Sequence, residues 1–311
     1  MGVNAVIYAG ALVFVVGCVL RVLQYSRMPR HLRWELYPVP HGDPGRIAHG
    51  GSEFEDLDAM ASSRHESHAG ELRIMVPEIL FLRGLWEFNR SLWRRSFPFH
   101  AGLYLMIASA VILGASALVS LWDSAWVESW LGGAAHVVYT LAGVAGAVLV
   151  LVGSVGLLLK RLRDPELSNY TTAGDIFNLL FFAVTVALLL AGYAARGSGF
   201  PGTLALTRGL LTLRATPFVP APLAAGLVLL AVLTAYIPYT HMSHFIGKFF
   251  TYHAVRWDDA ANVPSGKLER KMAEYLTYRP TWSAAHIGAD GARPWAEIAR
   301  GPQGQGARRP Q

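Results

Sequence analysis

Long apolar stretches alternate with polar, arginine-rich segments along this sequence. Five of the apolar stretches approach the roughly 20 residues that a helix needs to cross a bilayer, and they cover residues 5–23, 99–122, 135–159, 176–195 and 222–245. The first has no basic residue before it and no small-residue cleavage site, so we expect a retained span rather than a signal peptide. The pattern predicts an all-α membrane protein in which five transmembrane helices form a bundle.

The basic residues between these spans predict the orientation. Residues 24–98 contain ten arginines, and basic clusters also follow the third span at Lys160–Arg163 and the fifth at Lys248. Because basic residues near span ends stay in the cytoplasm, we expect the N-terminus outside and the C-terminus inside. Three arginines between the fourth and fifth spans, Arg196, Arg208 and Arg214, are on the opposite side, but the basic residues of the other loops outnumber them. This predicts a membrane domain over residues 1–246 with a cytoplasmic insertion at 24–98, followed by a cytoplasmic tail at 247–311.

Composition agrees with a membrane protein and narrows the chemistry. Only 15% of residues are charged, against about 25% in ordinary soluble domains. The single cysteine, Cys18, excludes a disulfide framework and a cluster held by about four thiolates. The chain has no C-x-x-C-H motif for covalent c-type haem. Any metal is therefore expected on histidine or carboxylate.

The insertion ends in a mixed apolar, aromatic and basic stretch, residues 73–95. This composition is typical of a helix lying among lipid headgroups. A docking surface for a cytoplasmic subunit is an alternative, and the two are compatible.

Histidines at span ends are the candidate ligands, because an ionisable residue at membrane depth is costly and usually functional. His100 opens the second span and His244 closes the fifth, so alternating spans place both at the cytoplasmic side. One imidazole from each of two helices can hold a haem iron axially, and the small residues Ala101, Gly102, Ala108 and Ala110 are expected to leave room for the ring. His241 lies three residues before His244, on the same face if the helix is continuous. Spacing alone does not separate these two, and both could instead be interfacial side chains.

Two further residues have simpler interpretations. His136 opens the third span on the outer side, where no histidine is found to partner it, and an interfacial position is the simpler expectation. Asp175 precedes the fourth span and is expected to cap that helix rather than to relay protons.

Several motifs resemble a known family. They are FHAGL at Phe99–Leu103, the stretch from Gly156 to Asp175, and IPYTHMSH at Ile237–His244. In order and spacing they are similar to the gamma subunit of respiratory nitrate reductase, a five-helix membrane cytochrome b. The closer resemblance is to the cytochrome b subunits of transmembrane electron-transfer complexes in sulfate-reducing bacteria, through segments His31–His41, Pro77–Arg90 and Thr281–Gly291.

The resemblance implies a site and its limits. It places the ligands of a cytoplasmic-side haem b on His100 and His244, and it places an arginine position of the family on His241. The family's second, outer haem would need histidines where this chain has Ala110 and Gly226. We therefore expect one haem b, although two are typical of the relatives and His136 could only partly restore a second site.

The resemblance also implies a role in a complex. The chain would be a redox subunit of an oxidoreductase in the inner membrane of a bacterium rather than a stand-alone enzyme. It would exchange electrons between quinone, or an outer multihaem cytochrome c, and a cytoplasmic iron–sulfur subunit. Lipid and quinone are the other partners implied, and no nucleic acid is expected. His241 is a candidate proton donor or acceptor for quinone. A haem-free membrane anchor or carrier with interfacial histidines is the alternative.

Overall fold

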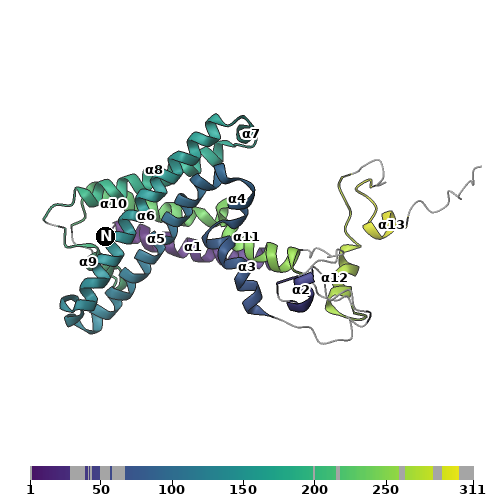
Figure 1. Ribbon diagram of the computed structural model, residues 1–311, viewed down its shortest axis with the longest axis horizontal. Coiled ribbons are helices and arrows are strands. Elements are labelled where there is room, and N and C mark those ends of the chain that lie inside the picture. Colours follow the sequence, from purple (N-terminus) through teal and green to yellow (C-terminus); the bar gives the residue numbers. More distant parts are fainter. Residues whose placement is uncertain are drawn as a thin grey trace, which may run out of the picture. The chain divides into compact units, whose positions relative to one another are not determined.

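The computed structural model describes residues 2–28, 39–40, 42, 44–49, 57, 67–198, 200–214, 218–258, 263–282 and 289–300. Over these ranges the chain forms helices and turns and no strand (Figure 1). Most of His31–His41, and residues 283–288 of Thr281–Gly291, lie outside them. The chain divides into two compact units, the first comprising Met1–Val22 and Leu72–Ile246 and the second Leu23–Glu71 and Gly247–Gln311.

The five predicted spans are confirmed as helices long and apolar enough to cross a membrane. They are α1 (Gly2–Ser26), α5 (Arg90–Trp122), α6 (Trp130–Arg163), α8 (Ala173–Ala194) and α10 (Ala221–Tyr236), which a 3₁₀ turn extends to Tyr239. The observed helices are mostly longer than the apolar runs. α5, for example, begins nine residues before the predicted start at Phe99, because Asn89 caps it by accepting a hydrogen bond from the Leu92 amide.

Shorter helices connect the spans. Residues 73–95 were expected to form one interfacial helix, but they divide into α3 (His68–Leu80), α4 (Arg83–Phe88) and the start of α5. The chain turns between α3 and α4 at Leu82, which has a positive φ of 52°. The other short elements near the spans are η2 (Ser124–Glu128), α7 (Pro165–Ser168) and α9 (Thr203–Leu211).

The second unit contains α2 (Pro44–His49), most of α11 (His244–Thr251), the π-helical turn η5 (Tyr252–Arg256), α12 (Lys267–Tyr275) and α13 (Trp295–Ala299). Within it, Tyr252 and Trp257 are buried and pack edge to face at a centroid distance of 4.6 Å.

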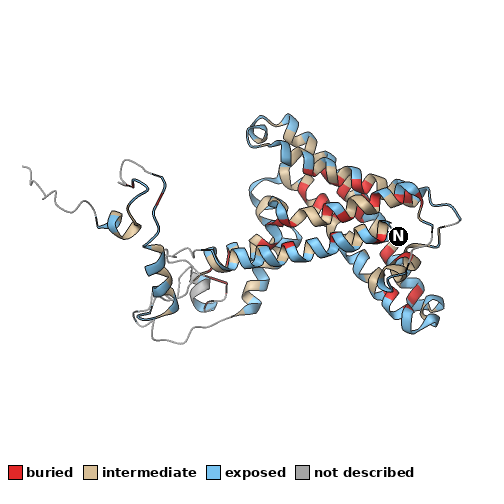
Figure 2. Ribbon diagram, turned by 180° about the vertical axis from the view of Figure 1, so that it is seen from behind, coloured by how far each residue is buried: buried red, intermediate tan, exposed pale blue. Residues whose placement is uncertain are grey.

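The core of the first unit lies where α5, α6, α8 and α10 meet (Figure 2). Its fully or nearly buried side chains are Phe99, Ala147, Val150, Phe182, Val186 and Leu233. A side chain on Gly102 would lie 2.6 Å from the Gly146 carbonyl oxygen, and one on Gly153 would lie 2.6 Å from Phe99. Small residues of this kind let membrane helices approach closely. The paired numbers run in opposite directions, so α5 and α6 are antiparallel.

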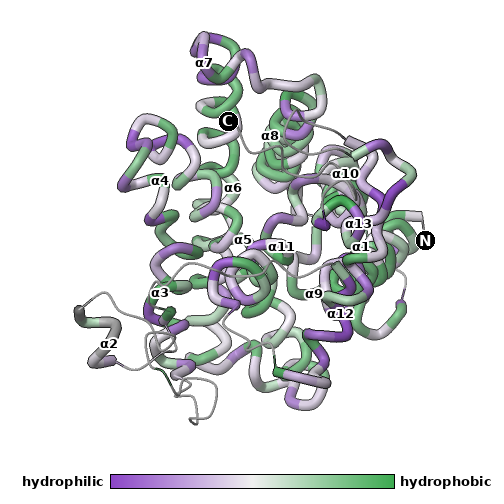
Figure 3. Tube along the Cα trace, turned by 90° about the vertical axis from the view of Figure 1, so that its right-hand side faces the viewer, coloured by the Kyte–Doolittle hydropathy of each residue, from purple (hydrophilic) through white to green (hydrophobic). Residues whose placement is uncertain are grey.

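Large apolar side chains also cover the outer faces of the spans. Leu12, Val111, Leu141 and Val152 are all exposed, and the Cα trace of α5, α6, α8 and α10 is mostly hydrophobic along its length (Figure 3). In water such surfaces would associate, whereas in a bilayer they meet lipid chains. The outward apolar surface therefore agrees with a multi-pass membrane protein.

The fifth span departs from the prediction. A continuous helix was expected to residue 245, with His241 and His244 on one face. Instead α10 ends at Tyr236, and two 3₁₀ turns follow, η3 (Ile237–Tyr239) and η4 (His241–Ser243), before α11 begins at His244. Pro238 has no amide hydrogen and interrupts the helix here. His241 and His244 thus lie in different elements.

A histidine pair at the basic end of the bundle

Helix directions bring one set of span ends together. Because α5 and α6 are antiparallel, the start of α5 lies beside the end of α6, where the Arg95 side chain approaches Gly156. The basic residues at these ends are Arg90, Arg94, Arg95, Lys160, Arg161 and Arg163. Just past α6, a hydrogen bond from Lys160 to Asp164 holds the pKa of that carboxyl below its ordinary value, so Asp164 is anionic at neutral pH.

His100 lies at this end, in the third turn of α5. Its Nδ1–H donates to the carbonyl oxygen of Ser96 over 2.8 Å, and the Ser96 hydroxyl lies 3.3 Å from the same nitrogen. A carbonyl accepts but never donates, so a proton is assigned to Nδ1, and in the neutral ring the lone pair is then on Nε2. The ring packs edge to face against Phe99, which is buried in the core. The side chain is thus oriented before any ligand binds.

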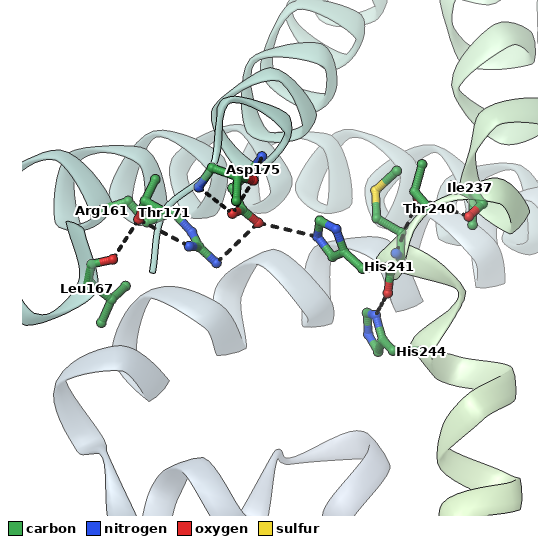
Figure 4. A network of polar contacts seen from close by, with 10 residues as sticks. Arg161, Leu167, Thr171, Asp175, Ile237, Thr240, His241 and His244 are labelled. Atoms are coloured by element: carbon green, nitrogen blue, oxygen red, sulfur yellow. Dashed lines mark hydrogen bonds and ion pairs between the residues drawn. The ribbon is translucent and has the colours of Figure 1, made fainter. Parts of the chain in front are cut away.

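His244 begins α11 and is oriented in the same way. Its Nδ1–H donates to the carbonyl oxygen of His241 over 3.1 Å, shown as a dashed line in Figure 4. This assignment again leaves the lone pair on Nε2. Metal-bound histidines usually donate their other ring N–H to a carbonyl, carboxylate or water. Both histidines therefore have the tautomer that a metal ligand needs.

The two rings lie next to each other in an edge-to-face arrangement. Their centroids are 6.2 Å apart and their planes cross at 65°. A histidine–metal bond is about 2 Å long, and a ring centroid lies about 1.1 Å from its own nitrogen, so two imidazoles sharing one metal have centroids about 6 Å apart. The observed centroid separation of 6.2 Å is close to this value. Within the described residues no group of three or more histidine, cysteine or acidic side chains could hold a metal ion.

His241 takes a different position from His244. Its exposed ring is directed at Asp175, with 3.6 Å between Nε2 and Oδ1, and the Arg161 guanidinium lies 3.7 Å from the same oxygen (Figure 4). The other oxygen of Asp175 accepts from the amide and hydroxyl of Thr172, and Thr172 in turn caps α8. Asp175 was expected to precede the helix and cap it, but α8 begins at Ala173 and its N-cap is Thr172; Asp175 contributes from the third helical position, as the second half of a reciprocal capping box.

The remaining predicted positions, His136, Ala110 and Gly226, lie apart from the histidine pair. His136 is exposed near the start of α6 and its ring lies against Tyr139. Gly226, one position where the resemblance would need a second-haem ligand, packs directly on α8, and a Cβ there would lie 2.9 Å from the Leu189 amide nitrogen. Ala110, the other position, is exposed. A histidine at position 226 would therefore need α8 and α10 to separate.

Of the small residues expected to make room for a ring, Gly102 has another role. Gly102 forms the close contact with α6 described above, and Ala108 and Ala110 are exposed on the outside of α5. Of the four residues, Gly102 therefore serves helix packing, and room for a ring beside Ala101, Ala108 and Ala110 stays a prediction. A contact that was not predicted from the sequence is made by Arg21, whose Nε donates to the carbonyl oxygen of Pro238 over 2.7 Å. The sequence did contain a signal for this contact: an arginine inside one apolar span, and a proline inside another that would release a backbone carbonyl.

Comparison with known proteins does not indicate a family or a function for this chain. The sequence matches no model of a known protein family, and no curated protein matches it. The histidine pair and its surroundings therefore carry the functional interpretation.

Proposed function

We propose that this protein is the membrane subunit of a respiratory electron-transfer complex and holds one haem b between His100 and His244. The observation that carries the proposal is the adjacent pair of rings, with centroids 6.2 Å apart and each Nδ1 donating to a backbone carbonyl. A bound haem would supply one-electron transfer. The protein would act as a redox subunit and not as a stand-alone enzyme.

The residues present fit such a group. His100 and His244 come from separate elements, α5 and α11, and each has its Nδ1 on a backbone carbonyl, so Nε2 is the nitrogen that would ligate iron. Phe99 and Tyr104 lie beside the His100 ring, with ring centroids 5.4 and 6.5 Å away. The bundle core next to Phe99 excludes water from one side of His100.

The position of the pair indicates the route of the electrons. The basic span ends around it are cytoplasmic by the positive-inside rule, which places the N-terminus outside and the site near the inner face of a bacterial cytoplasmic membrane. An electron held there is close enough to the surface to pass to a cytoplasmic iron–sulfur subunit. The other partner is the quinone pool or an outer cytochrome. The resemblance of the span motifs to membrane cytochromes b supports the same assignment.

His241 is the residue through which quinone chemistry would couple to this site. Its ring is exposed and directed at Asp175, and imidazole exchanges protons near neutral pH. Unchanged quinol oxidation by a His241→Ala membrane preparation would remove His241 from this role and leave the haem assignment standing.

An optical difference spectrum tests the proposal. Purified protein is expected to show reduced-minus-oxidised b-type bands and about one haem per chain, and His100→Ala and His244→Ala are each expected to lose them because iron needs both axial ligands. His136→Ala and His241→Ala are the matched controls and are expected to keep the bands.

Three outcomes would contradict the proposal in different ways. Absence of b-type bands from the unaltered protein would favour the haem-free anchor. A ratio near two haems would reveal a second site. Loss of the bands in His241→Ala with retention in His244→Ala would show that the ligand assignment is wrong.

A further inference from the structure

The first span packs alongside the fifth in a fixed register. A Cβ on Gly10 would lie 2.6 Å from the Ala231 carbonyl oxygen, and a Cβ on Gly17 would lie 2.7 Å from the Cβ of Pro238. Both steps along the chain are seven residues, so α1 and α10 run parallel. Because glycine has no side chain, Gly10 contacts the backbone of Ala231 directly and Gly17 contacts the ring of Pro238. A small shift of α1 along α10 would break both contacts.

One turn beyond Gly17, α1 brings Arg21 to the break in the fifth span. Arg21 Nε donates to the carbonyl oxygen of Pro238 over 2.7 Å. In a continuous helix this oxygen would accept from the amide of Met242, but that amide donates to the Thr240 hydroxyl instead, over 3.2 Å. The guanidinium thus binds an acceptor that the helix has released. An arginine within a transmembrane segment is costly and usually has such a partner.

Arg21 bonds η3, and the turn that follows, η4, orients His244. Thr240 joins the two turns, because it caps η4 while its own amide and hydroxyl donate to the Ile237 carbonyl in η3. In η4 the carbonyl of His241 accepts from His244 Nδ1. On the other side, Asp175 lies against the His241 ring (Figure 4). The backbone that fixes the His244 ring is therefore anchored by α1 at Pro238.

We infer that Arg21 is a positioning residue for the axial ligand His244, acting through the Pro238 carbonyl. The inference depends on the proposed function, since it concerns how the chain presents a haem ligand. The first span accordingly contributes to the metal site although it supplies no ligand. Outer-shell groups of this kind typically change metal affinity or activity 10–100-fold when removed.

The test compares haem ligation in variants of the full-length protein purified with its haem. Arg21→Met removes the donor and is expected to release haem to an acceptor protein about tenfold faster. The reduced variant is also expected to bind carbon monoxide, because a displaced His244 leaves the iron five-coordinate. Arg21→Lys keeps a cationic donor and is expected to restore most of the six-coordinate spectrum. Arg163→Met removes one exposed charge from the same end of the bundle and is expected to behave like the unaltered protein.

Two glycine variants distinguish a loss of His244 positioning from a general loss of stability. They also provide the test if Arg21→Met does not fold. Gly17→Ala pushes α1 away from Pro238, whereas Gly10→Ala pushes it away from Ala231, seven residues from the turn. Both are expected to lower thermal stability, but only Gly17→Ala is expected to raise carbon monoxide binding.

The inference would be overturned if the Arg21→Met and Gly17→Ala proteins kept an unaltered six-coordinate spectrum and the original haem release rate. It would also be overturned if Gly10→Ala changed ligation as much as Gly17→Ala. Absence of haem from the unaltered protein is a separate outcome that overturns the proposed function itself.

Discussion

The contact between α5 and α6 gives a quantitative test of the packing. Gly102→Ala would place a Cβ 2.6 Å from the Gly146 carbonyl oxygen, 2.7 Å from the Val150 amide nitrogen and 2.9 Å from the Leu149 side chain. Two of these neighbours are backbone atoms and cannot rotate away. Ordinary contact begins at 3.4 Å, so the two helices must separate by about 0.8 Å in a close-packed interior.

Gly114→Ala is the matched control, since it lies in the same helix and a Cβ there meets nothing within 4 Å. Alanine in a helix is favoured over glycine by about 1 kcal/mol, and both variants share this gain. Gly102→Ala alone incurs an overpacking cost of about 1–3 kcal/mol. The difference between the two variants is therefore expected to be about 1–3 kcal/mol, with Gly102→Ala the less stable.

Thermal unfolding in detergent, followed by far-ultraviolet circular dichroism, measures this difference. About 2–4 °C of melting temperature corresponds to 1 kcal/mol for a unit of this size, so Gly102→Ala should melt roughly 2–12 °C below Gly114→Ala. A Gly102→Ala protein that melts at or above the control would refute the close contact between α5 and α6.

Three other predictions concern separate parts of the molecule. Thr172→Ala removes the capping box of α8 and should lower the unfolding free energy by about 1 kcal/mol, seen as a lower melting temperature, and an unchanged melt would contradict the cap. Gly226→His, even combined with Ala110→His, should destabilise the protein and leave the haem ratio unchanged, because position 226 abuts the Leu189 backbone; a gain of b-type absorbance would show that the outer half has room. Backbone amides of Arg293 and Ala292, with the Arg293 guanidinium, lower the pKa of Asp290 to about 2. The anion stabilises that turn, so local protection from amide exchange should be complete above about pH 4, fall as pH drops through about 2, and lose this dependence in Asp290→Asn.

The hydrophobic pattern was sufficient to predict five spans, because each is a long apolar run that lipid can surround. It predicted their alternation as well, and hence that His100 and His244 would meet. The ends were harder to predict. α5 begins at Arg90 through a cap on Asn89 and extends well beyond its apolar core, and hydropathy contains no information on such hydrogen bonds.

The break in the fifth span could not be predicted from apolar periodicity. Pro238 was visible, but proline often only kinks a membrane helix. Here the released carbonyl is taken up by Arg21, 217 residues away in the sequence, and a contact of that range leaves no local signature. The same break separates His241 from His244, which spacing alone had placed on one face.

The parallel pairing of α1 with α10 has a consequence for how the protein is made. The first span leaves the ribosome long before the fifth, so Arg21 enters the bilayer while its carbonyl acceptor has not yet been synthesised. The bond between Arg21 and the Pro238 carbonyl can therefore form only after the fifth span has been made. The turn before His244 thus gains this contact last, although the residue that provides it belongs to the first span.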